Sequence, residues 1–169
     1  MVACVGQSGS GKTTLLERLI SSLVKDDLKI GCVKHTHHNF EIDQAGKESH
    51  KLRKAGASQM LLGAPNRFAF IAENDSPSGY SLRDFCRCFD KTRLDLILVE
   101  GFGEEDIPKI EVRKAENSIS NKTRTYTQVI AVVGESAMEK SDGIEYFEPD
   151  NTDALKTFLL NYIGWRRQP

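Results

Sequence analysis

Long apolar runs, paired cysteines and an excess of charge of one sign are all missing from this 169-residue sequence. No stretch reaches the roughly 18 consecutive apolar residues that a membrane-spanning helix needs. The first residues also lack the basic and apolar regions of a signal peptide. We therefore expect a cytoplasmic protein with no membrane contact. A net charge of −1 gives no electrostatic reason to expect a nucleic acid as partner.

The cysteines are too few and wrongly spaced for a disulfide framework or a zinc site. None of the four forms a C-x-x-C pair, so we expect reduced thiols that behave as small hydrophobic side chains. With 39% hydrophobic and 28% charged residues, the composition is ordinary for a globular protein. The length suits one domain that spans residues 1–169.

Apolar runs alternate with amphipathic stretches along the chain. This alternation predicts a three-layer α/β/α domain with a mostly parallel central sheet. The expected strands cover residues 2–5, 28–34, 58–63, 67–72, 94–99, 107–113 and 129–133, and the expected helices cover residues 13–24, 46–55, 153–163 and a segment beginning at Ser81.

The segment after the first expected strand reads Gly6-Gln7-Ser8-Gly9-Ser10-Gly11-Lys12-Thr13. It matches the P-loop pattern G-x-x-x-x-G-K-[ST] in full, with a strand before it and a helix after it. Lys12 would reach the β- and γ-phosphates, Thr13 would ligate Mg²⁺, and Thr14 would be a further phosphate contact. The alternative is a glycine-rich turn that holds an anion only by chance. Backbone N–H groups and the helix N-terminus would hold phosphate at Gly6, Ser8, Gly9, Ser10 and Gly11.

A P-loop protein also needs a carboxylate for Mg²⁺, because a hard cation prefers oxygen ligands. Glu100 follows a buried apolar run, at the place where such a carboxylate is expected. Asp43, in the loop after the second strand, is a second candidate that would act through water. The alternatives are an exposed strand end for Glu100 and a helix N-cap or first-turn acid for Asp43.

Three histidines crowd the segment Lys34-His35-Thr36-His37-His38. Imidazole suits Zn, Ni and Cu, yet a short loop rarely supplies a complete metal site. A loop that binds an anionic ligand or a partner is the favoured interpretation, and simple packing or exposure is the other. Lys34 would turn a positive charge toward the phosphates, and both Lys34 and His35 are candidate nucleotide contacts.

The motifs of the chain also stand in a particular order and spacing. They occupy residues 6–14, 34–38, 43–49, 55–57 and 98–102, the last followed by Pro108-Lys109-Ile110-Glu111-Val112. Together they resemble the molybdopterin-guanine dinucleotide biosynthesis adapter family, MobB, over roughly residues 2–113. The P-loop is shared by many families, but the histidine, D-x-x-G-K and V-E-G-F segments together are far more specific.

The resemblance implies a P-loop NTPase fold and a homodimer. It also implies that the protein binds GTP and Mg²⁺ and has at most weak GTPase activity. Such a protein is mainly an adapter. It assists a nucleotidyltransferase that converts molybdopterin to its guanine dinucleotide form, and molybdopterin itself is a candidate ligand. Carried over by position, Gly9, Gly11 and Lys12–Thr14 would hold phosphate, with Asp43 and Glu100 on the magnesium side. Basic residues that would meet an anionic pterin are Lys34, Lys47, Lys51 and Arg53, although solvated helix charges are the favoured interpretation of the last two.

The chain departs from the family pattern at two positions. Glu48 stands where Asp is usual, and Gly103 stands where Lys is common. The guanine-reading N-K-x-D signature is also absent, because Asn121-Lys122-Thr123-Arg124 lacks the aspartate. The identity of the base as guanine therefore depends on the resemblance, and our candidate for a base pocket is the segment near Gly134–Glu135.

Two other classes of P-loop protein are alternatives for this chain. A GTPase that delivers metal to nickel enzymes would use the histidine loop, with ligands His37 and His38. A small-molecule kinase would need an acceptor pocket, and the absence of an arginine-rich lid segment argues against it. No residue is assigned as catalytic, because no glutamine or arginine finger is evident. A finger is worth roughly 10³–10⁵ in rate, so its absence fits slow hydrolysis.

Overall fold

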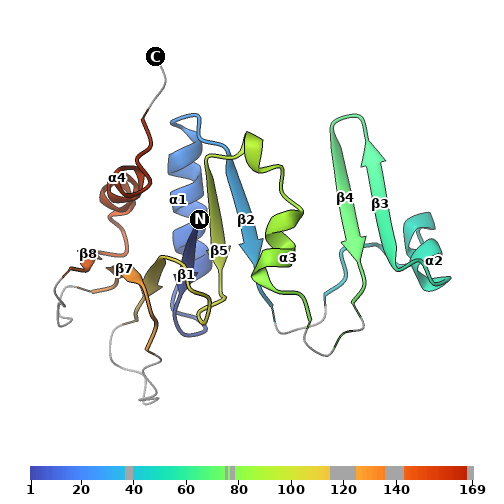
Figure 1. Ribbon diagram of the computed structural model, residues 1–169, viewed down its shortest axis with the longest axis horizontal. Coiled ribbons are helices and arrows are strands. Elements are labelled where there is room, and N and C mark those ends of the chain that lie inside the picture. Colours follow the sequence, from blue (N-terminus) through green and yellow to red (C-terminus); the bar gives the residue numbers. More distant parts are fainter. Residues whose placement is uncertain (37–39, 75, 77–78, 115–124, 136–142, 167–169) are drawn as a thin grey trace. The chain divides into compact units, whose positions relative to one another are not determined.

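The computed structural model describes residues 1–36, 40–74, 76, 79–114, 125–135 and 143–166 (Figure 1). The chain forms two compact units. The larger unit contains Met1–His35 and Phe85–Pro169, and the smaller unit contains Thr36–Asp84. A single domain over residues 1–169 stays a prediction.

The larger unit contains a six-stranded sheet in which every neighbouring pair of strands is parallel. The strands lie in the order β2-β5-β1-β6-β7-β8. Because parallel strands end at one edge, the carboxyl ends of β1, β2 and β5 meet, and ligands of open α/β sheets bind at such an edge. The strands are β1 (Val2–Val5), β2 (Ile30–Lys34), β5 (Leu96–Glu100), β6 (Lys109–Val112), β7 (Val129–Val133) and β8 (Glu145–Phe147).

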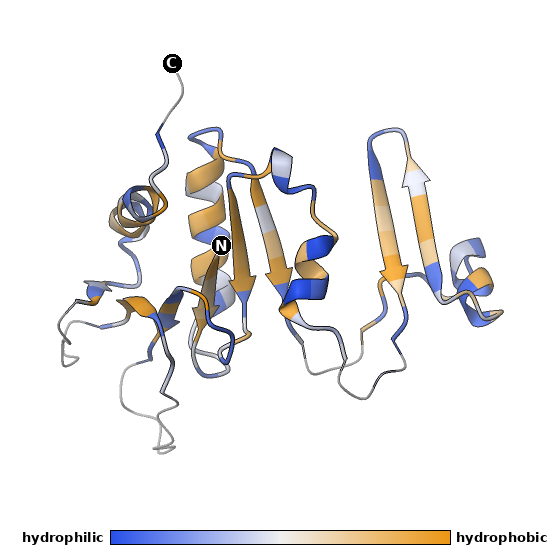
Figure 2. Ribbon diagram, in the orientation of Figure 1, coloured by the Kyte–Doolittle hydropathy of each residue, from blue (hydrophilic) through white to orange (hydrophobic). Residues whose placement is uncertain are grey.

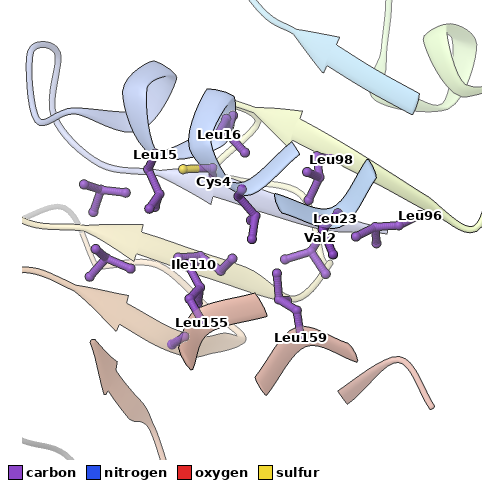
Figure 3. Packing of buried hydrophobic residues seen from close by; sticks show 14 of the residues in the cluster. Val2, Cys4, Leu15, Leu16, Leu23, Leu96, Leu98, Ile110, Leu155 and Leu159 are labelled. Carbon is purple, nitrogen blue, oxygen red and sulfur yellow. The ribbon is translucent and has the colours of Figure 1, made fainter. Parts of the chain in front are cut away.

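Two helices bury their leucines against one face of this sheet. They are α1 (Lys12–Val24) and α4 (Thr152–Tyr162), which also contact each other. Leu19 and Leu23 of α1 and Leu155 and Leu159 of α4 are almost fully buried in one hydrophobic cluster with strand residues. Figure 3 shows Leu23, Leu155 and Leu159 in this cluster. Burial of one such side chain contributes about 1.5–3 kcal/mol, so this layer accounts for much of the stability of the unit.

The opposite face is covered near β2 by the segment between α3 (Leu82–Arg87) and β5, which includes the 3₁₀ helix η1 (Lys91–Arg93). The backbone of Gly31 lies directly against Leu94 and Phe89 from this segment. Apolar residues therefore meet both faces of the central strands. This explains why β5 is a continuous buried run rather than an alternating one.

The smaller unit contains α2 (Glu48–Lys54) and an antiparallel hairpin of β3 (Gln59–Ala64) and β4 (Arg67–Ala72). The apolar colouring of the hairpin in Figure 2 corresponds to side chains that are largely exposed on both faces. Leu61 pairs with Phe70 on one face, and Leu62 lies on the other. Phe68 is 71% exposed.

Arg53 of α2 gathers three carboxylates in the smaller unit. Its guanidinium lies 2.7 Å from Glu73, 3.5 Å from Glu41 and 3.7 Å from Asp43. The hydrogen bond to Glu73 is the main cause of a raised pKa for Arg53. The interpretation of Arg53 as a solvated helix charge was wrong, because its side chain is only 11% exposed.

Most predicted elements occur within two residues of their expected bounds, with a few informative differences. β8 was not expected at all. β2 begins at Ile30 rather than at residue 28. Just before it, the Lys29 backbone N–H donates a hydrogen bond to the Asp95 carboxylate, 2.7 Å away, instead of to a neighbouring strand. In the described residues, no helix has the length and apolarity to cross a bilayer.

Candidate functional site

The loop between β1 and α1 is closed by its own lysine. Lys12 Nζ donates hydrogen bonds to the carbonyl oxygens of Gly6 and Gln7, at 3.0 and 2.6 Å. The Ser10 N–H donates to Gln7 O at 3.2 Å, and α1 begins directly after Gly11. A cation therefore lies beside the N-terminus of a helix, and both the positive charge and the free N–H groups of a helix N-terminus favour phosphate.

Gly6 stands at the tightest point of the loop. Its φ is +141°, and a Cβ there would lie 2.3 Å from the carbonyl oxygen of Val112 on β6. The buried Ser10 Oγ lies 3.0 Å from the same position and has no hydrogen-bond partner among the described residues. Only glycine fits between the two neighbours, so β6 sets the path of the phosphate loop.

The other loop residues named from the sequence lie on its outer surface. Ser8 and Gly9 are exposed in the loop itself, and Thr14 is exposed in the first turn of α1. The P-loop residues thus come together as the motif predicts. Their binding of nucleotide stays a prediction.

Thr13, Glu100 and Lys34 meet at the carboxyl ends of β2 and β5. Lys34 and Glu100 are register partners on these neighbouring strands. Thr13 Oγ1 donates to the carboxylate of Glu100 with both oxygens at 3.0 Å. Lys34 Nζ lies 3.0 Å from both carboxylate oxygens and 3.2 Å from Thr13 Oγ1.

The oxygens of this cluster suit a small hard cation. A hydroxyl and a carboxylate lie within hydrogen-bonding distance of each other beside the phosphate loop, and Mg²⁺ is bound in proteins by such oxygen donors. The side chain of Glu100 is 14% exposed, so it is not the solvated strand end that we considered as the alternative. Thr13 and Glu100 are the residues that would hold Mg²⁺.

Asp43 belongs to the smaller unit. It accepts a hydrogen bond from Ser49 Oγ at 2.8 Å, in the first turn of α2, and it neighbours Arg53. Asp43 nevertheless lies before the helix, whose N-cap is Lys47 and whose first-turn acid is Glu48, so the alternative of Asp43 as an N-cap or first-turn acid was wrong. A role of Asp43 toward Mg²⁺ stays a prediction.

His35 packs against the chain that follows Glu100. Its ring stacks on Phe102 with centroids 4.6 Å apart, and its Cβ lies 3.2 Å from the place where a Cβ on Gly101 would stand. The His35 backbone N–H donates to the carbonyl oxygen of Glu100. His35 thus buttresses the strand end that carries the carboxylate, whereas His37 and His38 lie outside the described residues.

The described part of the chain contains no cluster of transition-metal ligands. No group of three or more His, Cys, Asp or Glu side chains there could hold a metal ion. Burial raises the pKa of the Cys4 thiol to about 12, with Lys12 opposing the shift and Glu100 adding to it. Cys4 is therefore a neutral packing residue beneath the phosphate loop rather than a ligand.

The carboxyl ends of β6, β7 and β8 border the site on its other side. Arg113 donates to Glu111 at 2.9 Å, and this hydrogen bond is the main cause of a raised pKa for Arg113. The Gly134 N–H donates to Phe147 O at 3.0 Å, which joins the ends of β7 and β8. The Gly134 segment thus lies at the strand edge that also carries the phosphate loop, and a base pocket there stays a prediction.

Sequence reasoning missed the role of Lys109. This residue is fully buried, and its Nζ donates to the carbonyl oxygens of Glu105, Ile107 and Thr127 at 2.6, 3.0 and 2.9 Å. It anchors the loop that follows Glu100 to the segment before β7. The sequence contains little signal for this role, because the four-residue strand β6 has a second charged residue besides the lysine.

The departure at Gly103 has a structural counterpart. A Cβ at this position would lie 2.5 Å from Cε1 of Tyr126. The aromatic ring occupies the space that a side chain at residue 103 would take. A lysine, which is common there in the family that the chain resembles, would therefore require the Tyr126 ring to move.

The sequence is similar to those of known proteins. A model of the family described as "Molybdopterin guanine dinucleotide synthesis protein B" (MobB) matches residues 1–135. A Haemophilus influenzae protein called "Molybdopterin-guanine dinucleotide biosynthesis adapter protein" is 43% identical over 116 residues, which cover 69% of this chain and 64% of that protein. An Escherichia coli protein of the same name is 43% identical over 110 residues, 65% of this chain and 63% of that protein. The chain spans less than two thirds of the length of these two relatives.

Solved structures agree with the architecture. A crystal structure of a MobB homologue from Bacillus stearothermophilus has a TM-score of 0.73 at 23% identity, covering 98% of both chains. The structure of MobB from Bacillus subtilis has a TM-score of 0.75 at 24% identity, covering 94% of both chains. The predicted α/β fold with a mostly parallel sheet is confirmed.

Proposed function

Because the chain belongs to the molybdopterin guanine dinucleotide synthesis protein B family, we propose that it is a GTP-binding adapter in the formation of that dinucleotide. It binds GTP with Mg²⁺, hydrolyses it slowly at most, and assists a cytoplasmic nucleotidyltransferase that acts on molybdopterin. The observation that carries the proposal is the joint geometry of the phosphate loop and the Thr13–Glu100 pair.

The residues divide the work of binding between them. Lys12, released from the loop carbonyls, places its charge among the phosphates, and the backbone of residues 6–11 donates hydrogen bonds to them. Thr13 and Glu100 offer oxygens to Mg²⁺, which neutralises phosphate charge when it is bound. The only proposed catalysis is this electrostatic support, which fits an adapter better than a fast enzyme.

The hairpin of the smaller unit supports a homodimer. A two-stranded hairpin is marginally stable alone, and its exposed strand edges and apolar side chains, among them Leu61, Phe68 and Phe70, are features that proteins usually cover. A second copy of the chain would cover them. Light scattering on the wild type and on Phe68→Ser tests this, because a dimer built on the hairpin should weaken in the variant.

The test of nucleotide binding is isothermal titration with GTP and with ATP, each with Mg²⁺. We expect binding with a clear preference for GTP. Equal binding, or a preference for ATP, would contradict the adapter assignment and favour a small-molecule kinase. The nickel-delivery alternative depends on His37 and His38 and predicts stoichiometric Ni²⁺ binding.

Lys12→Ala provides the matched check of the site. We expect it to abolish measurable triphosphate binding while the circular dichroism spectrum stays unchanged. Lys29→Ala, which removes an exposed lysine just before β2, serves as the control and should bind GTP normally. Unchanged affinity in Lys12→Ala would refute the assignment of the phosphate loop.

A further inference from the structure

The ammonium of Lys34 lies against the same oxygens that would hold Mg²⁺. It contacts both carboxylate oxygens of Glu100 at 3.0 Å and the hydroxyl of Thr13 at 3.2 Å. The parallel register of β2 and β5 places Lys34 and Glu100 side by side, so this contact is built into the sheet. Lys34 and Mg²⁺ are therefore competitors for one carboxylate.

The two partners differ in burial. The side chain of Glu100 is 14% exposed, whereas that of Lys34 is 56% exposed. A carboxylate so far removed from water is destabilised when it has no cation beside it. The lysine, in contrast, has an exposed stem on the edge strand of the sheet, so it can withdraw into water at low cost.

We propose that Lys34 is an internal counter-cation, which neutralises Glu100 in the metal-free protein and is displaced when Mg²⁺ enters with the nucleotide. The inference rests on the proposed function, because it concerns the nucleotide site. It deepens that function by giving Lys34 two successive contacts. In the metal-free protein Lys34 contacts the Glu100 carboxylate, and after Mg²⁺ has bound it contacts the phosphates.

The exchange has a measurable consequence for metal dependence. With Lys34 in place, Glu100 does not repel an incoming triphosphate even without metal. Mg²⁺ gains less binding free energy from Glu100, because it must first displace the Lys34 ammonium. Binding and displacement are linked thermodynamically, so Lys34 lowers the factor by which Mg²⁺ tightens nucleotide binding.

A lysine that only touches phosphate predicts something different. Its removal would weaken GTP binding by similar factors with and without metal. The quantity that separates the two roles is the ratio of the GTP dissociation constant measured in EDTA to that measured in Mg²⁺. We expect Lys34→Met to raise this ratio about twofold to fivefold, the effect of one half-exposed charge pair.

Two variants act as controls. Lys34→Arg keeps a cation within reach of Glu100 and should retain a ratio close to that of the wild type. Lys29→Met removes an exposed charge just before the same strand begins and should leave the ratio unchanged. Circular dichroism verifies that each variant is folded. We expect all of them to fold, because an exposed lysine on an edge strand contributes little to stability.

A double-mutant cycle tests the pair itself. In a Glu100→Gln background the carboxylate is absent, so adding Lys34→Met should not raise the ratio further. As a second readout, electron paramagnetic resonance of Mn²⁺ with GTP-loaded protein should show tighter metal binding in Lys34→Met than in the wild type.

The outcomes separate cleanly. A raised ratio in Lys34→Met that disappears in the Glu100→Gln background supports the inference. An unchanged ratio, or an equal rise in both backgrounds, overturns it while GTP binding by the wild type keeps the proposed function intact. A wild type that binds no triphosphate in either condition overturns the proposed function and this inference together.

Discussion

Gly6→Ala offers a quantitative check of how β6 shapes the phosphate loop. The added Cβ would stand 2.3 Å from the Val112 carbonyl oxygen, whereas real Cβ atoms essentially never approach within 3.0 Å. The backbone must therefore separate by at least about 0.7 Å at a contact between two main-chain segments. The φ of +141° adds strain for any residue with a Cβ, about 1–3 kcal/mol.

Together the clash and the strain should destabilise the larger unit by about 3–4 kcal/mol. Gly9→Ala separates the two terms, because Gly9 also has a positive φ of +74° but no atom within 4 Å of its added Cβ. We expect Gly9→Ala to destabilise by only about 1–2 kcal/mol, the strain alone.

The assay is urea unfolding of the nucleotide-free protein, followed by tryptophan fluorescence. The single tryptophan, Trp165, packs against the core of the larger unit, so its emission reports on the unit that contains Gly6. If Gly6→Ala and Gly9→Ala lose equal stability within about 0.5 kcal/mol, the close approach to Val112 does not constrain the loop and the argument is refuted.

Three further predictions follow from the packing. Asn151→Ala removes the side-chain cap that accepts the Ala154 N–H and should cost about 1 kcal/mol in urea unfolding; a loss below about 0.3 kcal/mol would mean that the cap is not formed in solution. Leu159→Ala opens a cavity at a side chain with no exposure and should cost about 3 kcal/mol, and a loss no larger than that of Asn151→Ala would contradict the packing of α4. Iodoacetamide at pH 8 should label exposed Cys88 but not buried Cys4, whose pKa burial raises to about 12; mass spectrometry that finds Cys4 alkylated in folded protein would overturn that environment. Since the ordinary value is 9.0, the stability from a neutral Cys4 is complete below pH 9 and declines as pH rises toward 12.

Local patterns predicted the elements that carry their own signals. The P-loop motif predicted a strand, a turn and a helix, and the structure has β1, the loop and α1 in that order. A helix was expected to begin at Ser81, and a capping box begins it: the Asp84 N–H donates to Ser81 Oγ at 3.2 Å, and the Ser81 N–H donates to Asp84 Oδ2 at 3.1 Å. Each of these features involves residues only a few positions apart, so the sequence contains all the information needed.

Elements without such signals were missed. β8 has only three residues, Glu145–Phe147, which is too short to show a period. The burial of Arg53 depends on Glu41 and Glu73, which are 12 and 20 residues away. No helical pattern in the sequence of α2 distinguishes such a residue from a solvated one.

The sequence by itself determined that this chain builds a phosphate loop on a parallel α/β sheet, because backbone conformation and helix capping are local matters. Only the tertiary structure decided which charges share the site. Lys34 and Glu100 are 66 residues apart, and Thr13 and Glu100 are 87 apart. They meet because β5 lies between β2 and β1, and the order and register of parallel strands follow from how the whole core packs.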